Sequence, residues 1–316
     1  MTGVQKHFPA DYRKARAAFI AACERAGLGV ITRVHPSASG PDGKPVFMDT
    51  AVIGPRESGT ALLLISGTHG VEGYFGSGVQ TGLLREGLAK RLKKGAKIVL
   101  LHALNPFGFA WNRRVNENNA DINRNFVDHR RPPRNAAYDL LAAAIAPKVI
   151  SPEAIHEANA ELNAYARKYG AFRLQQAISA GQYNHADGLY YGGPAPSWSA
   201  VMLRDVLKEE IGDVKRLTVI DFHTGLGGCG DAEMITEDLP GSSAYRRAKA
   251  LWGALVRSSE AGESKPSEAA CEHCHSTSSL VPAKPITARL SVNGWPTLCR
   301  SSTSGVSAEF RTCSRC

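Results

Sequence analysis

Three apolar runs that each end in a polar loop constrain the fold more than any other feature of the sequence. They are "TALLLIS" at 60–66, "AKIVLLH" at 96–102 and "LTVIDF" at 217–222. Short continuous apolar runs bounded by turn residues are typical of strands buried on both faces of a sheet. Helical periodicity occurs between them, most clearly at 136–180. This alternation predicts a three-layer α/β/α sandwich with a mixed, largely parallel central sheet.

Charge and hydropathy exclude several function classes. The net charge of +9 is spread along the chain, without the basic and aromatic stripe that nucleic-acid partners require. No apolar run reaches the roughly 18 to 20 residues needed to span a bilayer, so no membrane partner is expected. The N-terminus lacks the apolar core of a secretory signal, and Cys23 and Cys229 are the only cysteines before residue 258. Sparse cysteines fit a reducing compartment, so we expect a cytoplasmic protein.

The character of the sequence changes near Ser258. Residues 258–316 are rich in Ser, Pro, Thr and Cys and have little periodicity. We therefore expect one α/β domain at 1–257 and an atypical tail at 258–316, as a frameshifted coding sequence would give. The tail contains "CEHCH" and "CSRC", two Cys–x–x–Cys pairs separated by 38 residues. Zinc ribbons usually separate such pairs by roughly 15 to 20 residues, which argues against a ribbon.

Polar residues gather where the predicted strands end. His69 and Glu72 lie in "SGTHGVEG" after the first run, and His223 lies in "DFHTGLGG" after the third. A lone His–x–x–Glu is most often an ordinary loop. Together with a distant histidine from another strand end, however, it supplies the imidazole and carboxylate ligands of a catalytic zinc. Asp121 and Asp221 are both available to hold a ligand's second ring nitrogen.

A second polar segment, "NADINRNF" at 119–126, suggests an anion site. Arg124 is flanked by Asn123 and Asn125, and a planar guanidinium with neighbouring amides can grip a carboxylate. Arg113 and Arg114 lie one loop upstream. Apolar residues interrupt the segment, so part of it is expected to pack inward.

Three motifs together resemble the carboxypeptidase A-type zinc hydrolase superfamily. They are "GTHGVEG", "NPFGFAWNRRVNENNADINRNF" and "DFHTGLG", in the order that the superfamily has them. The nearest resemblance is to an uncharacterised bacterial branch catalogued as zinc peptidases, which "GQYNHADGLYYGGPAPSWS" at 181–199 also resembles. The resemblance covers roughly residues 5 to 257. It implies a zinc carboxypeptidase-like fold with one zinc per chain, held by His69, Glu72 and His223.

The resemblance also implies roles for the polar residues of the middle motif. Asp121 matches the carboxylate that orients the first histidine ligand. Asn123 and Arg124 match the pair that holds the substrate's terminal carboxylate. Arg113 or Arg114 matches the arginine that polarises the scissile carbonyl, and the spacing favours Arg114.

The implied activity is metal-assisted hydrolysis of an amide bond next to a free carboxylate, in a small peptide or an N-acyl amino acid. The superfamily places its proton-accepting glutamate late in the chain. Here the only near match is "VSAEFRT", which makes Glu309 the base and puts Arg311 where a glycine is usual. If the tail is frameshifted, the base is displaced and the chain is a zinc-binding pseudoenzyme.

A different enzyme class is suggested by "GLGGCG" at 225–230, which satisfies the Gly–x–Gly–x–x–Gly fingerprint of dinucleotide-binding oxidoreductases. That fingerprint requires a helix opening at the third glycine and an acidic residue about 20 residues later. Here Asp231 and Glu233 come too early, and Pro240 interrupts the following segment. We therefore interpret it as a glycine-rich loop after the third metal ligand.

Overall fold

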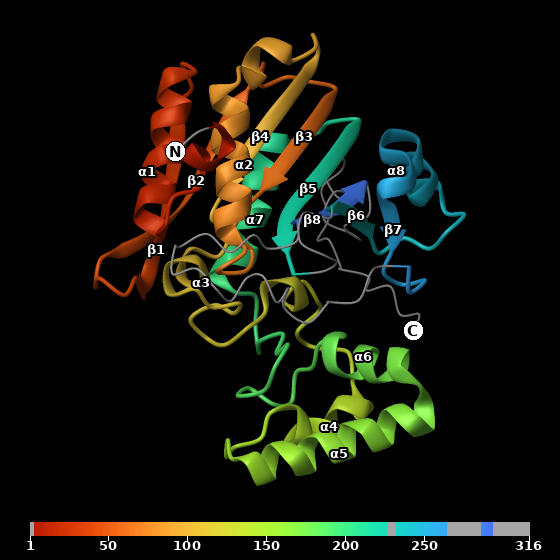
Figure 1. The fold of residues 1–316 in the computed structure, drawn as a ribbon. Helices are drawn as coiled ribbons and strands as arrows, with labels where there is room; N and C mark the ends of the chain where they lie inside the picture. The colour runs from red at the N-terminus through yellow and green to blue at the C-terminus, as the bar shows by residue number, and fades with distance from the viewer. Residues whose placement is uncertain (1–2, 226–231, 264–285, 293–316) are drawn as a thin grey trace. The chain divides into compact units, whose positions relative to one another are not determined.

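The structure is a computed structural model that describes residues 3–225, 232–263 and 286–292 (Figure 1). The chain divides into two compact units. The first contains the residues up to Arg114 and the described residues from Met202 onward, and the second contains residues 115–201.

The first unit is built on one sheet, which has eight strands within the described residues, in the order β1-β2-β4-β3-β5-β8-β6-β7. Pairing is parallel for β3 with β4, β3 with β5, β6 with β7 and β6 with β8, and antiparallel for the remaining neighbours. The strands are β1 Val30–Ser39, β2 Pro45–Ile53, β3 Thr60–Ile65, β4 Ala96–His102, β5 Arg216–Thr224, β6 Ala232–Thr236, β7 Val256–Ser258 and β8 Ile286–Val292.

Eight α-helices accompany the strands in the described ranges: α1 Tyr12–Arg25, α2 Gly73–Arg85, α3 Pro106–Trp111, α4 Ala136–Ile145, α5 Pro152–Tyr169, α6 Ala171–Ser179, α7 Trp198–Val206 and α8 Ser243–Trp252. Short 3-10 turns occur at Gly3–His7, Leu88–Arg91, Ile122–Arg124 (η3) and Gly253–Leu255, and a π-helical turn occurs at Leu207–Ile211. No helix in these ranges has both the length and the apolarity needed to cross a bilayer.

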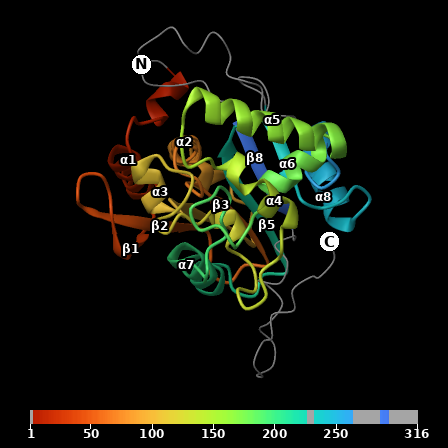
Figure 2. The same ribbon diagram turned by 90° about the horizontal axis from the view of Figure 1, so that it is seen from below.

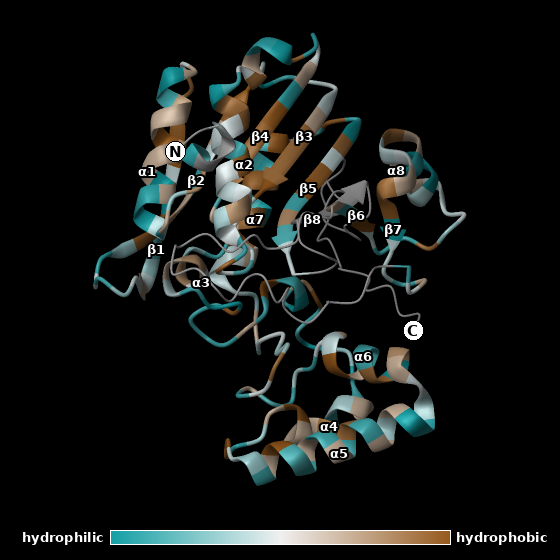
Figure 3. Ribbon diagram, in the orientation of Figure 1, coloured by the Kyte–Doolittle hydropathy of each residue, from teal (hydrophilic) through white to brown (hydrophobic). Residues whose placement is uncertain are grey.

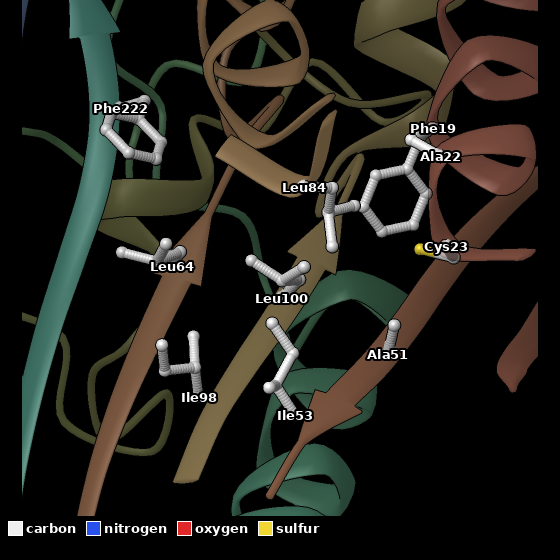
Figure 4. Close-up of a cluster of buried hydrophobic side chains, with 10 residues drawn as sticks. All are labelled: Phe19, Ala22, Cys23, Ala51, Ile53, Leu64, Leu84, Ile98, Leu100 and Phe222. Atoms are coloured by element: carbon white, nitrogen blue, oxygen red, sulfur yellow. The ribbon is translucent and has the colours of Figure 1, made fainter. Parts of the chain in front are cut away.

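Helices cover both faces of the sheet in the first unit. Phe19 of α1 and Leu84 of α2 pack on Leu64, Leu100 and Phe222 of the strands (Figure 4). α8 packs on the same face near β5, while α7 lies behind the sheet in Figure 1. The middle strands β3 and β4 are the most apolar part of the sheet (Figure 3). The three-layer sandwich with a mixed sheet that the sequence predicts is thus confirmed.

The second unit carries the helices expected within residues 136–180. α4, α5 and α6 lie side by side in the views of Figures 1 and 2. α4 and α5 begin at capping residues, since Asn135 and Ser151 accept hydrogen bonds from the backbone N–H groups of Tyr138 and Ala154. α5 has no fully buried residue, so it is a surface helix of this unit.

Candidate metal centre

Glycines shape the loop that follows β3. The Gly70 N–H donates to the Arg113 carbonyl oxygen at 2.9 Å, and a Cβ on Gly70 would collide with that oxygen. In α2, a Cβ on Gly76 would lie 2.7 Å from the Cβ of Ser66. The loop that carries His69 and the start of α2 therefore pack directly on their neighbours, with no room for side chains at these two positions.

Three side chains from two strand ends converge here. The Glu72 carboxylate lies between two imidazoles: its Oε1 is 3.3 Å from Nδ1 of His69, and its Oε2 is 2.8 Å from Nδ1 of His223. One ligand atom from each residue lies within 4.8 Å of the others. The Thr224 N–H also donates to Glu72 Oε2 at 3.1 Å. Since β3 and β5 are parallel neighbours, the loops after them meet at the same edge of the sheet.

A buried carboxylate orients His223. Asp221 Oδ2 accepts a hydrogen bond from Nε2 of His223 at 2.7 Å, and its Oδ1 accepts one from the Thr68 hydroxyl at 2.7 Å. The bond at Nε2 fixes the ring so that Nδ1 faces the cluster. Asp221 and His223 are two residues apart on β5, and residues at this spacing share a face of a strand. That spacing is the sequence signal that selects Asp221 as the partner of His223.

The electrostatics of the cluster favour positive charge. Burial alone would lower the pKa of His223, but the Asp221 and Glu72 carboxylates outweigh it and raise the pKa to about 9. Burial alone would raise the pKa of Glu72, but the charge of His69 and the hydrogen bonds from both histidines hold it well below its ordinary value. The ionised carboxylate between two imidazoles therefore attracts cations.

The donor set fits a divalent metal. Two ligands at about 2.0–2.2 Å from a tetrahedral zinc are roughly 3.3–3.6 Å apart. The 3.3 Å between Nδ1 of His69 and Oε1 of Glu72 matches that separation, whereas the 2.8 Å between Oε2 of Glu72 and Nδ1 of His223 is a hydrogen-bond distance that zinc binding would lengthen. Two imidazoles and one carboxylate are also a ligand combination of catalytic zinc, which leaves a fourth position open. His69, Glu72 and His223 can thus hold zinc with small side-chain adjustments.

The structure distinguishes the two arginines upstream. Nη1 of Arg114 lies 3.5 Å from Oε1 of Glu72, and its side chain is 41% exposed. Arg113 meets this region through its backbone, since its carbonyl accepts from Gly70 and its N–H donates to the Gly108 carbonyl. Arg114 thus has its guanidinium beside Glu72, and its catalytic role stays a prediction.

The residues expected to bind the substrate's carboxylate lie in the second unit, in and around η3. The Asp121 carboxylate caps η3 by accepting from the Asn123 N–H at 2.9 Å. Nε and Nη2 of Arg124 donate to the Ser179 carbonyl oxygen at 3.0 and 2.6 Å. The Arg124 guanidinium is therefore held at the C-terminus of α6, and Tyr183 donates to the Arg124 main-chain oxygen at 2.7 Å. The substrate-binding roles of Asn123 and Arg124 and the ligand-orienting role of Asp121 remain predictions.

The expectation that Asn125 offers an amide to an anion is wrong. Its Nδ2 donates to the carbonyls of Gly192 and Ala195 at 2.7 and 2.9 Å, and its Oδ1 accepts from the Ser197 N–H at 2.7 Å. The residue is fully buried. Asn125 therefore fastens the 192–197 segment, and no part of its amide is available to a ligand.

Several expectations concern the later part of the chain. Glu309, Arg311 and both Cys–x–x–Cys pairs lie outside the described residues. The fingerprint at 225–230 lies outside them except for Gly225. The segment that follows it, Ala232–Thr236, is the strand β6 and not the helix that a dinucleotide site requires. The oxidoreductase alternative therefore lacks its structural context.

Solved structures of three proteins are similar to this chain at a low level. A glutaminyl cyclase from Fimbriiglobus ruber is 12% identical over 31% of this chain and 42% of its own, with a TM-score of 0.25, so the chain spans less than half of its length. Bovine thrombin-activatable fibrinolysis inhibitor, solved with tick carboxypeptidase inhibitor, is 13% identical over 94% and 91%, with a TM-score of 0.43. A candidate succinylglutamate desuccinylase/aspartoacylase from Shewanella frigidimarina is 14% identical over 83% and 65%, with a TM-score of 0.31.

Comparison with curated protein sequences gives no significant match. One family model matches residues 8–294, which is most of the chain and extends past residue 257 into the expected tail. The chain therefore belongs to the family described as "Protein of unknown function (DUF2817)".

Proposed function

We propose that this protein is a zinc-dependent hydrolase that cleaves an amide bond next to a free carboxylate, as a carboxypeptidase or an N-acyl amino acid deacylase does. The observation that carries the proposal is the convergence of His69, Glu72 and His223, with ligand atoms within 4.8 Å of one another. When bound there, zinc would supply Lewis-acid chemistry and would lower the pKa of a water molecule towards about 7.

The residues around the cluster would support this chemistry. Asp221 holds His223 in the orientation that presents Nδ1. Arg114, beside Glu72 and partly exposed, would donate hydrogen bonds to the scissile carbonyl oxygen as negative charge develops on it. Its fixed positive charge would stabilise that oxygen more in the transition state than in the ground state.

Recognition of the substrate would depend on the second unit. We assign the free carboxylate of a peptide or an N-acyl amino acid to Arg124, with Asn123 beside it in the chain. Arginine suits this role because its planar N–H groups match the two oxygens of a carboxylate. Binding the carboxylate in one place would hold the neighbouring amide bond in one position for attack.

The proton acceptor would be Glu309. It would take a proton from the attacking water and return it to the leaving amine. If residues 258–316 do not place Glu309 at the cluster, the same chain would bind zinc and ligand without turnover. We expect the protein to act in the cytoplasm on small molecules, without nucleic acid or membrane as a partner.

The test is an assay of the zinc-loaded full chain and of its Glu309→Gln variant, with peptides bearing free C-terminal residues and with N-acyl amino acids. Turnover by the natural chain and loss of it in the variant would support the hydrolase and its base. Negligible turnover in both, with zinc bound, would favour the pseudoenzyme. NAD found in the purified protein would overturn both.

A further inference from the structure

A buried polar seam, formed by Ser66, Gln80 and Ala103, joins α2 to the ends of β3 and β4. Gln80 is fully buried in α2. Its Nε2 donates to the main-chain oxygens of Leu64 and Leu101, both at 3.0 Å. Its Oε1 accepts from the Ser66 hydroxyl at 2.9 Å. A single amide thus ties the helix to both strands.

The seam lies where the ladder between β3 and β4 becomes irregular. Ile65 pairs with Leu101, so a regular parallel ladder would next join the Ala103 N–H to the Ser66 carbonyl. Instead the Leu104 N–H donates to that carbonyl at 2.9 Å, and the Ala103 N–H reaches only the Ser66 hydroxyl, at 3.4 Å. Ala103 is bulged out of the ladder and takes a φ of 62°, a left-handed conformation that non-glycine residues adopt at a cost.

The bulge at Ala103 places Asn105 beside the loop that carries His69. After it, the Asn105 N–H donates to the Gly67 carbonyl at 2.9 Å, and Asn105 Nδ2 donates to the Thr68 carbonyl at 3.4 Å. These contacts hold the main chain immediately before His69. A Cβ on Gly67 would lie 2.9 Å from the Cα of Ala103, so the loop packs on the bulge itself.

The helix that contains Gln80 begins at the metal ligand Glu72. Glu72 is the N-cap residue of α2, but its side chain makes no capping hydrogen bond, because its carboxylate faces the two histidines. Its place therefore depends on where α2 lies on the sheet. Gln80, about two helical turns further along, fixes α2 to β3 and β4.

We propose that the seam is a positioning device for the metal ligands and that Gln80 is its central positioning residue, which sets the placement of Glu72 relative to His69. An apolar side chain at position 80 could fill the same space without burying an amide. Strain and buried polar groups that persist together indicate a geometric requirement nearby. This inference rests on the proposed metal centre and adds residues that touch none of its ligands.

The test compares zinc affinity in four forms of the full chain: wild type, Gln80→Met, Ser66→Ala and Leu203→Ala. Methionine keeps the length of glutamine and removes its hydrogen bonds. Leu203 is a buried residue of α7. Leu203→Ala is therefore expected to lower the stability of the protein without removing a contact of the seam, and it serves as the control for lost stability. Loss of a group that directly holds a metal ligand commonly costs 10- to 100-fold in affinity. Gln80 acts through α2 and not on a ligand directly, so we expect Gln80→Met to weaken zinc binding by the lower end of that range, about 10-fold, and Ser66→Ala to weaken it less. Leu203→Ala should change the affinity less than about 2-fold, since it removes none of the hydrogen bonds that join α2 to β3 and β4.

A spectroscopic measurement separates positioning from stability. With cobalt in place of zinc, the visible absorption of Gln80→Met should differ from that of wild type, while that of Leu203→Ala should not. If Gln80→Met is less stable but keeps the wild-type affinity and spectrum, the seam is structural only and the inference is overturned. If Gln80→Met does not fold, the same comparison with Ser66→Ala decides. A wild-type chain that binds no zinc would overturn the metal centre, and this inference with it.

Discussion

The two regions that carry the predicted site residues are held in place by different means. In the first unit, the His69–Glu72–His223 cluster lies just after strand ends and at a helix start, and the parallel pairing of β3 with β5 brings the loops after these strands together. In the second unit, the segment around Arg124 has only the short turn η3, and the buried Asn125 amide ties it to the main-chain oxygens of Gly192 and Ala195. A ligand set on a sheet depends mainly on backbone pairing, whereas a loop depends on individual side chains.

Each region contains a residue in the left-handed conformation that is neither glycine nor asparagine, the two residue types that adopt it most readily. In the first unit it is Ala103, at a φ of 62°, and in the second it is Tyr190, at a φ of 53°. The Arg124 guanidinium carbon lies 5.8 Å from the centre of the Tyr190 ring. Such residues persist only where their surroundings over-determine them, which marks both regions as geometrically demanding.

The largest effect should come from removing a ligand of the cluster. His69→Ala should lower bound zinc from about one per chain to less than about a tenth, because a site with three protein ligands does not survive the loss of one. Elemental analysis of dialysed protein measures this. His156→Ala, which removes an exposed histidine of α5, should leave the zinc content unchanged. Stoichiometric zinc in His69→Ala would show that the ligand assignment is wrong.

In the second unit the largest effect should be on stability. Asn125→Ala removes three buried hydrogen bonds and should lower the free energy of unfolding by about 3 kcal/mol, at roughly 1 kcal/mol for each bond. Urea denaturation measures the change. Asn123→Ala is the matched control, because the half-buried Asn123 side chain makes no hydrogen bond within the described residues. If Asn123→Ala and Asn125→Ala lost the same free energy of unfolding, the structural role assigned to the Asn125 amide would be contradicted.

Asp221→Asn tests whether the carboxylate that holds Nε2 of His223 raises the zinc affinity of the site. The change keeps the size of the side chain but weakens its acceptance from Nε2 of His223. It should therefore reduce zinc affinity 10- to 100-fold, or about 1.4–2.7 kcal/mol. Asp139→Asn alters a similar pair in the second unit, where Asp139 Oδ1 lies 3.0 Å from Nε2 of His185. A competition titration with a chelator should show no change for that variant.

Sequence reasoning predicted the cluster at the ends of β3 and β5 better than it predicted the segment around Arg124. Continuous apolar runs indicated β3, β4 and β5, and polar residues directly after such runs indicated where His69 and His223 would meet. The role of Asn125 was not predictable, because the same amide can bind a ligand or a distant main chain. Gln80 lies in an ordinary helical pattern, and its importance depends on a bulge at Ala103 that local sequence does not signal.

The smallest effect concerns His102, a fully buried histidine of β4 beside the seam. Its Nε2 lies 2.9 Å from the Ser77 hydroxyl oxygen. Burial lowers its pKa to about 4, Asp49 opposes this, and Arg16 adds to it. In the unfolded chain the pKa is about 6.5, so between about pH 6.5 and 4 the unfolded state binds a proton that the folded state does not bind. Stability from this group is therefore complete above pH 6.5 and is lost progressively as the pH falls towards 4.

Between pH 7.5 and 5.5 this histidine should cost the zinc-free protein about 1.3 kcal/mol of its free energy of unfolding. Urea denaturation of the wild type and of His102→Gln at both pH values isolates the contribution, because the other titrating groups are common to both proteins. The wild type should lose more stability than the variant by that amount. If both lose the same amount on acidification, His102 accepts a proton inside the fold, and the end of β4 can accommodate a buried charge.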